Sequence, residues 1–168
     1  SAVPLQSCMP VSLRLLGAVA VVRGGSEERV HFERPVALLV YLAAHGEWVE
    51  RSELAFLFRP EVPEAEALAY LRKLIFRARR HPWAEGLEVD GGALRWRVRT
   101  DLDRFRAASG ERAWEEALAL YRGPFLGESR LSHAPGFTAW QEVERDSLEA
   151  RWLQAADGRA RELELEGR

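Results

Sequence analysis

The spacing of the apolar residues changes within residues 64–98, and this change narrows the folds open to the chain. Apolar residues first recur at steps of three and four, which predicts a helix with one buried face over 64–80. Around Asp90-Gly91-Gly92 the period falls to two, which predicts a hairpin of strands 87–89 and 94–98. The apolar residues of the predicted helix are Leu68, Leu71, Leu74, Ile75 and Ala78.

Prolines and glycines divide the preceding residues into short elements. Pro35 fits the first turn of a helix that ends at Gly46, and two prolines make 59–63 a loop. The Gly24-Gly25 pair predicts a turn between strands. The predicted strands are 11–17, 19–23, 30–32 and 48–49, and the predicted helices are 35–45 and 51–58. We therefore expect an α+β fold: a winged helix-turn-helix over residues 11–101, with a small N-terminal β-sheet, three helices and a C-terminal β-hairpin wing.

Positive charge is concentrated in the predicted third helix and hairpin. Residues 71–106 carry 10 basic and 5 acidic side chains, although the net charge of the whole chain is −2. Residues 71–80 carry five basic side chains and no acidic one. Such a segment needs an anionic partner, most commonly nucleic-acid phosphate. We therefore expect double-stranded DNA as partner, with the third helix in the major groove and the hairpin on adjacent backbone.

The third helix carries the first candidate DNA contacts. Its outward face, opposite the apolar one, holds Lys73, Phe76, Arg77 and Arg80. The three basic residues of this face are placed to bind bases or phosphates, and the alternative is a solvated helix face with salt bridges. Arg72 and Arg79 lie nearer the buried flank, so each either contacts DNA or forms a structural ion pair.

The second group of candidate contacts lies on the hairpin and at the start of the second helix. Arg95, Arg97 and Arg99 alternate with apolar residues, which places all three on one face of the strand. They are candidates for phosphate or minor-groove contact, and the alternative is a charged strand edge that prevents aggregation. The backbone amides near Arg51 and Ser52 are candidates for a further phosphate contact.

A different composition begins near Leu102, and residues 102–168 are predicted to be helical throughout. One helix starts at Trp114 and is ended by Gly123-Pro124, and another follows Pro135. Asp101 and Asp103 are expected to cap or brace the junction between the two halves. Residues 1–10 show no periodic pattern and are expected to be a disordered tail.

No catalytic or metal-binding constellation stands out. The four histidines are far apart and lack metal-ligand spacing, and no nucleophile motif or phosphate-binding glycine loop occurs. The longest apolar run, 35–44, is too short for a membrane span. The single cysteine, Cys8, fits a reducing compartment. We therefore expect a cytoplasmic protein that is not an enzyme and has no catalytic residues, metal or cofactor.

Two stretches of the helical half resemble a known family. Residues 114–126 (WEEALALYRGPFL) and 134–145 resemble the bacterial transcriptional activator domain. Residues 35–45, 48–58 and 71–80 resemble the winged helix-turn-helix that precedes it in activators of the antibiotic-regulatory-protein type. The likeness covers about 11–167. It implies a partial activator domain over 102–168, which would be the start of a tetratricopeptide-like array. With about one helical repeat, the chain is then either a fragment of a longer regulator or a short form that closes its core by dimerising.

The resemblance also implies a function. Proteins of this type bind promoter DNA as dimers on repeats and recruit RNA polymerase through the loop between the second and third helices. The matching loop holds Arg59 and Glu61. Phe76 departs from the family, which usually has a small polar residue there, and it is placed to contact thymine methyls or to pack against a partner. The alternative function is a protein–protein interaction module with a degenerate winged helix.

Overall fold

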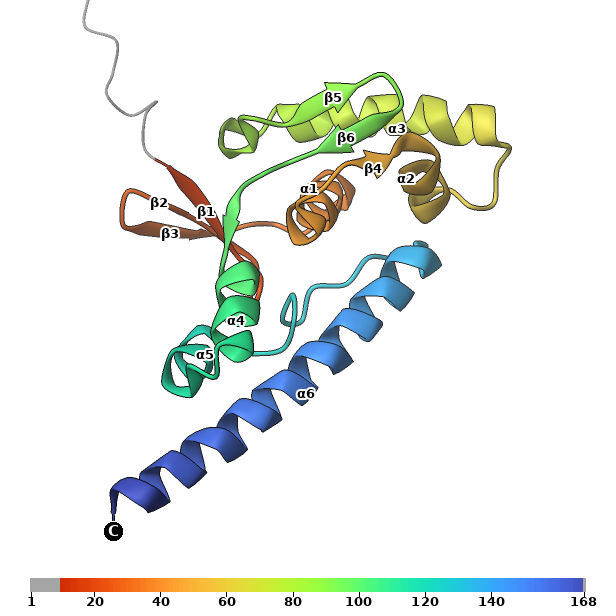
Figure 1. The fold of residues 1–168 in the computed structure, drawn as a ribbon. Coiled ribbons are helices and arrows are strands. Elements are labelled where there is room, and N and C mark those ends of the chain that lie inside the picture. The colour runs from red at the N-terminus through yellow and green to blue at the C-terminus, as the bar shows by residue number, and fades with distance from the viewer. Residues whose placement is uncertain (1–9, 168) are drawn as a thin grey trace, which may run out of the picture.

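The computed structural model describes residues 10–167. Within this range a small sheet, three helices and a β-hairpin are followed by three further helices (Figure 1). This mixed α and β composition agrees with the predicted class. The expected disordered tail lies outside the described residues, apart from Pro10. No described helix combines the length and the apolar character needed to cross a membrane.

The first sheet contains four strands in the order β3-β2-β1-β7. Its strands are β1 (Val11–Arg14), β2 (Ala20–Arg23), β3 (Ser26–Arg29) and β7 (Arg99–Thr100). The first three are antiparallel neighbours, whereas β7 lies parallel to β1. The strand predicted at 30–32 is wrong, because the chain turns at Gly24-Gly25 and pairs again at once through Ser26–Arg29.

The three predicted helices and the loop between the last two are confirmed. The helices are α1 (Arg34–His45), α2 (Arg51–Phe58) and α3 (Glu64–Arg79), with the short strand β4 (Val49–Glu50) before α2. Pro35 lies in the first turn of α1, and Gly46 ends the helix with a left-handed backbone that a side chain would strain. The buried face of α3 differs from the prediction at one position: Ala67 is buried, and Leu68 is half-buried.

The hairpin consists of β5 (Glu88–Asp90) and β6 (Ala93–Arg95), which with β4 form a sheet of order β4-β6-β5. The prediction of one long strand over 94–98 is wrong. Trp96 is buried, and its indole N–H donates to the carbonyl of Glu85 at 3.1 Å. Burying this side chain directs the chain away from the hairpin, and pairing resumes only where β7 joins β1.

The second half contains α4 (Asp101–Gly110), α5 (Trp114–Leu120) and α6 (Pro135–Glu166). The long helix α6 starts beside α2 and runs along the molecule past α5 (Figure 1). This half is not helical throughout, because residues 121–134 form a loop that pairs with the N-terminal segment. The amide of Leu126 donates to the carbonyl of Leu15 at 2.7 Å, and Gly17 donates to Pro124 at 3.0 Å.

One hydrophobic core extends through both halves. The ring centroids of Tyr41 in α1 and Trp140 in α6 lie 4.7 Å apart, and those of Phe58 in α2 and Phe137 in α6 lie 6.1 Å apart. These aromatic contacts bury the start of α6 against α1 and α2. The proposed division at residues 101 and 102 stays a prediction, and it falls where β7 passes directly into α4.

Candidate nucleic-acid interface

Positive charge is concentrated on the exposed side of α3. The four basic side chains of the helix and that of Arg80, the residue that caps its C-terminus, are all exposed, while the opposite face of the helix is buried in the core. Within residues 10–167, none of the five has an acidic oxygen within 4.0 Å. The structural ion pairs considered for Arg72 and Arg79 are therefore not formed. The five residues are Arg72, Lys73, Arg77, Arg79 and Arg80.

Phe76 lies in the middle of this positive face. Its side chain is 67% exposed, although Leu74 and Ile75 beside it are buried. The guanidinium carbon of Arg80 lies 6.0 Å from the centroid of the Phe76 ring, at the limit of a cation–π contact. The phenyl ring is therefore outside the core, next to a positive charge.

The start of α2 is already bound by the hairpin. The amide of Arg51 donates to the carbonyl of Gly92 at 2.8 Å, so the prediction that this amide receives a phosphate is wrong. The Arg51 side chain is half-buried, and its buried Nε atom has no hydrogen-bond partner within the described residues. Ser52 is exposed at the next position, and its contact with phosphate stays a prediction.

The positive charge of Arg95 is balanced by an ion pair on the hairpin. Its Nε and Nη2 atoms donate to the two carboxylate oxygens of Glu88 at 2.8 and 3.0 Å. The guanidinium also lies 4.3 Å from the ring centroid of Trp48, and only 15% of the side chain is exposed. The hydrogen bond lowers the pKa of Glu88 and raises that of Arg95, so both groups stay charged at neutral pH. The predicted face of three free arginines on one strand is therefore wrong.

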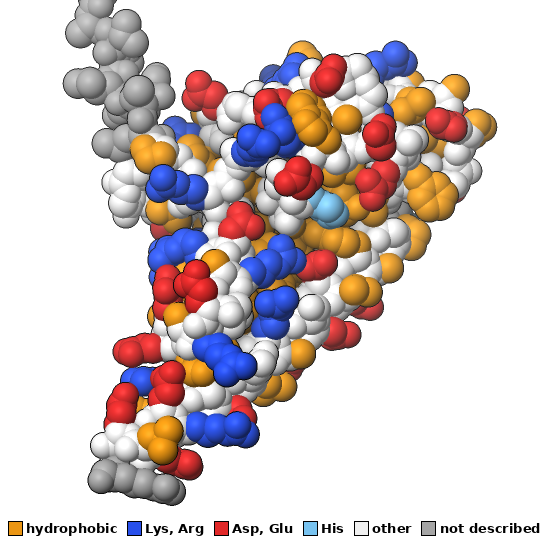
Figure 2. All heavy atoms as spheres, in the orientation of Figure 1, with side chains coloured by type: hydrophobic (Ala, Val, Ile, Leu, Met, Phe, Trp, Pro, Cys, Tyr) orange, Lys and Arg blue, Asp and Glu red, His pale blue; other side chains and the backbone are white. Residues whose placement is uncertain are grey.

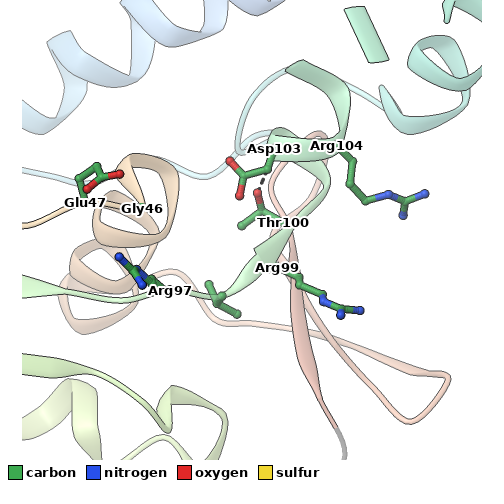
Figure 3. Close-up of a pocket in the computed structure, with 8 residues that line it drawn as sticks. Gly46, Glu47, Arg97, Arg99, Thr100, Asp103 and Arg104 are labelled. Atoms are coloured by element: carbon green, nitrogen blue, oxygen red, sulfur yellow. Dashed lines mark hydrogen bonds between the residues drawn. The ribbon is translucent and has the colours of Figure 1, made fainter. Parts of the chain in front are cut away.

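Arg97 is exposed on the segment that links the two sheets, and Arg99 is exposed at the start of β7. Together with Glu47 and Arg104 they line a hollow of about 710 Å³. Figure 3 shows Arg97 beside Gly46 and Glu47 at the end of α1, whereas Arg99 and Arg104 extend toward the other side. These guanidinium groups do not converge on one point, so each is placed to make a separate contact with an extended anion.

Asp101 braces the junction between the halves, as the sequence predicts. Its carboxylate oxygens accept hydrogen bonds from the amides of Leu15 and Leu16 at 2.7 and 3.1 Å. Burial raises the pKa of Asp101, while these hydrogen bonds act in the opposite direction. The Thr100 hydroxyl accepts from the amide of Asp103 at 3.0 Å and caps α4 (Figure 3).

The loop between α2 and α3 is held by its own side chains. Arg59 forms an ion pair with Glu61, and its guanidinium carbon lies 5.0 Å from the ring centroid of Tyr70 in α3. A backbone hydrogen bond and the one from Arg59 lower the pKa of Glu61. The two predicted polymerase-contact residues are thus partners of each other, and their contact with polymerase stays a prediction.

Elsewhere the charges are mixed in sign. On the face shown in Figure 2, basic and acidic side chains are interspersed along the helical half. Arg106 pairs with Glu144 at 2.8 Å, and Arg159 pairs with Glu162 at 3.1 Å. Among the described residues, no group of three or more His, Cys, Asp or Glu side chains is placed to hold a metal ion. The unpaired cations of α3 differ in this respect from the ion pairs of the helical half.

No protein-family model matches the chain, and none of the curated proteins matches it. Among solved structures, Mycobacterium tuberculosis EmbR in complex with a low-affinity phosphopeptide has a similar fold, with a TM-score of 0.64. The two sequences are 18% identical, and the match covers 88% of this chain but only 44% of the EmbR chain. The chain therefore shares a fold with less than half of EmbR, and the shared region includes parts of both halves described above.

Proposed function

We propose that this chain is a sequence-specific DNA-binding transcription regulator that activates promoters. The observation that carries the proposal is the outward face of α3, which presents five exposed basic side chains without acidic partners in the described chain. Leaving so many unpaired cations on one helix face favours an anionic partner over a solvated surface. Duplex DNA fits, since it accepts an α-helix in its major groove.

The arrangement around α3 supports this function. Helices α1 to α3, followed by the β5–β6 hairpin, have the element order of a winged helix-turn-helix, in which α3 is the recognition helix. We propose that Lys73, Arg77 and Arg80 contact bases and phosphates in the major groove. Arg72 and Arg97 are then placed for contacts with the phosphate backbone.

The remaining parts of the proposal rest on the family resemblance. We propose that the chain acts in the cytoplasm as a dimer on repeated DNA sites and recruits RNA polymerase through the loop that holds Arg59 and Glu61. The helical half would start a tetratricopeptide-like array, and the protein would have no enzymatic activity. The phosphopeptide in the EmbR structure is a ligand of EmbR, of which this chain matches 44%, so phosphopeptide binding is not part of the proposal.

Fluorescence anisotropy with a random pool of duplex DNA at two salt concentrations tests the proposal. The wild-type affinity should fall by about 0.9 log units per log unit of salt for each neutralised phosphate. The variant Arg77→Ala/Arg80→Ala should bind more weakly and with a smaller slope. The matched control is Arg151→Ala/Arg161→Ala, which removes the same charge from exposed positions of α6. Equal loss in both variants, or binding that does not respond to salt, would refute the proposal.

A protein-interaction module is the second candidate. It is favoured by two large apolar side chains on the helix-turn-helix, Phe56 on α2 and Phe76 on α3, which are 70% and 67% exposed. Aromatic residues of this kind are enriched at protein interfaces. Absence of DNA binding by the folded protein at low salt would favour this candidate.

A further inference from the structure

We infer that Phe76 is a specificity-determining residue that reads the methyl group of a thymine in the major groove. This inference rests on the proposed DNA binding and deepens it, since it names the base that one side chain recognises. The starting observation is a phenyl ring 67% exposed at the centre of the positive face of α3. No packing within the described chain accounts for an aromatic residue at this position.

The chemistry of the major groove limits what the ring can contact. The base edges there present hydrogen-bond donors and acceptors, and the one apolar group among them is the C5 methyl of thymine. A phenyl ring offers no hydrogen bond to a polar edge. Contact with a methyl group removes apolar surface of both partners from water, which is favourable. A thymine is therefore the base that complements Phe76.

The neighbours of Phe76 fix where this thymine lies. Lys73 precedes Phe76 by three residues and Arg80 follows it by four, so all three lie on one stripe of the helix. The guanidinium of Arg80 is 6.0 Å from the ring centroid. The ring therefore fits a thymine methyl whose neighbours in the DNA are phosphates or guanine edges, because these accept hydrogen bonds from the two flanking cations. The thymine should therefore lie within the part of the operator that these two basic residues contact.

The same charges argue against a second copy of the chain as the partner of Phe76. Two copies that met through this ring would bring five exposed basic side chains on each α3 toward those of the other. Within residues 10–167, no acidic oxygen lies within 4.0 Å of any of these basic side chains to balance its charge. Like charges brought together at an interface are destabilising.

The test removes the methyl group and the ring separately. The operator is first selected from a random duplex pool with the wild-type chain, and each thymine is then replaced in turn by deoxyuridine, which lacks only the C5 methyl. At one or two positions this should weaken wild-type binding about fourfold, which corresponds to the ~0.8 kcal/mol of one buried methyl-sized group. Phe76→Ala should bind thymine and deoxyuridine operators equally. The control Phe56→Ala, which removes an equally exposed ring from α2, should keep the fourfold difference.

The outcomes separate this inference from the proposed function. Salt-dependent DNA binding without any effect of deoxyuridine would overturn the role of Phe76 and leave DNA recognition intact. An effect of deoxyuridine that is equal in wild type and in Phe76→Ala would assign the methyl contact to another residue and also overturn the inference. Absence of DNA binding at low salt would overturn both. Circular dichroism and sedimentation of Phe76→Ala should match the wild type, and loss of a dimer in the absence of DNA would show instead that the ring packs between chains.

Discussion

Replacing Gly158 in α6 by alanine should destabilise the fold, although glycine is a poor helix former. A Cβ atom built at Gly158 would lie 2.7 Å from Cδ1 of Trp114, the first residue of α5, and closer still to Nε1 and Cε2 of the same ring. Real Cβ atoms do not approach other atoms so closely, so Gly158→Ala must displace the indole. The bare backbone of α6 at this position is what lets Trp114 lie against the helix.

The expected magnitude follows from two opposing effects. Replacing glycine by alanine inside a helix stabilises it by about 1 kcal/mol. Moving the half-buried Trp114 ring off α6 exposes roughly 80 Å² of apolar surface, which costs ~2 kcal/mol. The net expectation is a loss of ~1 kcal/mol in the free energy of unfolding. With a denaturant slope of about 2 kcal/mol per molar of urea, the midpoint of unfolding should fall by ~0.5 M.

Urea unfolding followed by circular dichroism measures this change. Gly110→Ala is the matched control, because Gly110 ends α4 with no atom within 4 Å of a built Cβ, and it should be neutral or slightly stabilising. In a Trp114→Ala background the clash is absent, so Gly158→Ala should there stabilise by ~1 kcal/mol. If Gly158→Ala stabilises the wild-type chain as much as it stabilises the Trp114→Ala variant, the packing argument is wrong.

Three further predictions follow from hydrogen bonds and charges. Asp101→Ala leaves two buried amides without an acceptor and should lower the free energy of unfolding by ~2–4 kcal/mol, measured by urea unfolding. Burial, followed by the charge of Glu53, raises the pKa of Tyr41 to about 12 from an ordinary value of 10.0. Because the pKa of Tyr41 is higher in the folded than in the unfolded protein, the neutral phenol stabilises the fold below pH 10, and this contribution is lost as the pH rises toward 12. Glu53→Gln should lower the pKa of Tyr41, measured by ultraviolet absorbance titration. Glu88→Gln removes the counter-charge of Arg95 and should raise affinity for duplex DNA and steepen its salt dependence, measured by anisotropy.

The sequence predicts α1, α2 and α3 well because their ends are marked by residues with fixed backbone preferences. Pro35 and Gly46 delimit α1, and the prolines of the 59–63 loop separate α2 from α3. The edge strand β3 escapes prediction because all four of its residues are exposed and polar, so it has no apolar alternation. The end of β6 depends on the burial of Trp96 against distant residues, which no local pattern reports.

The candidate interface also has one feature that the sequence analysis predicts and one that it misses. Which residues of α3 face outward follows from helical periodicity alone, and exposure confirms that orientation for Lys73, Phe76, Arg77 and Arg80. The ion pair of Arg95 could be predicted only by working out which residues face each other across the hairpin. A turn at Gly91-Gly92 places Glu88 directly opposite Arg95, so the ion pair was accessible from the sequence.

Arg34 links α3 to both halves of the molecule. Arg34, the first residue of α1, donates to the carbonyl of Phe58 at 2.9 Å and to the hydroxyl of Tyr70 in α3 at 3.3 Å. The same guanidinium donates to the carbonyl of His133 at 2.9 Å, just before α6 begins. One charged group therefore joins the end of α2, the middle of α3 and the loop that leads into α6. Because hydrogen bonds to a charged donor are stronger than neutral ones, Arg34 helps to hold α3 in a fixed position relative to the loop before α6.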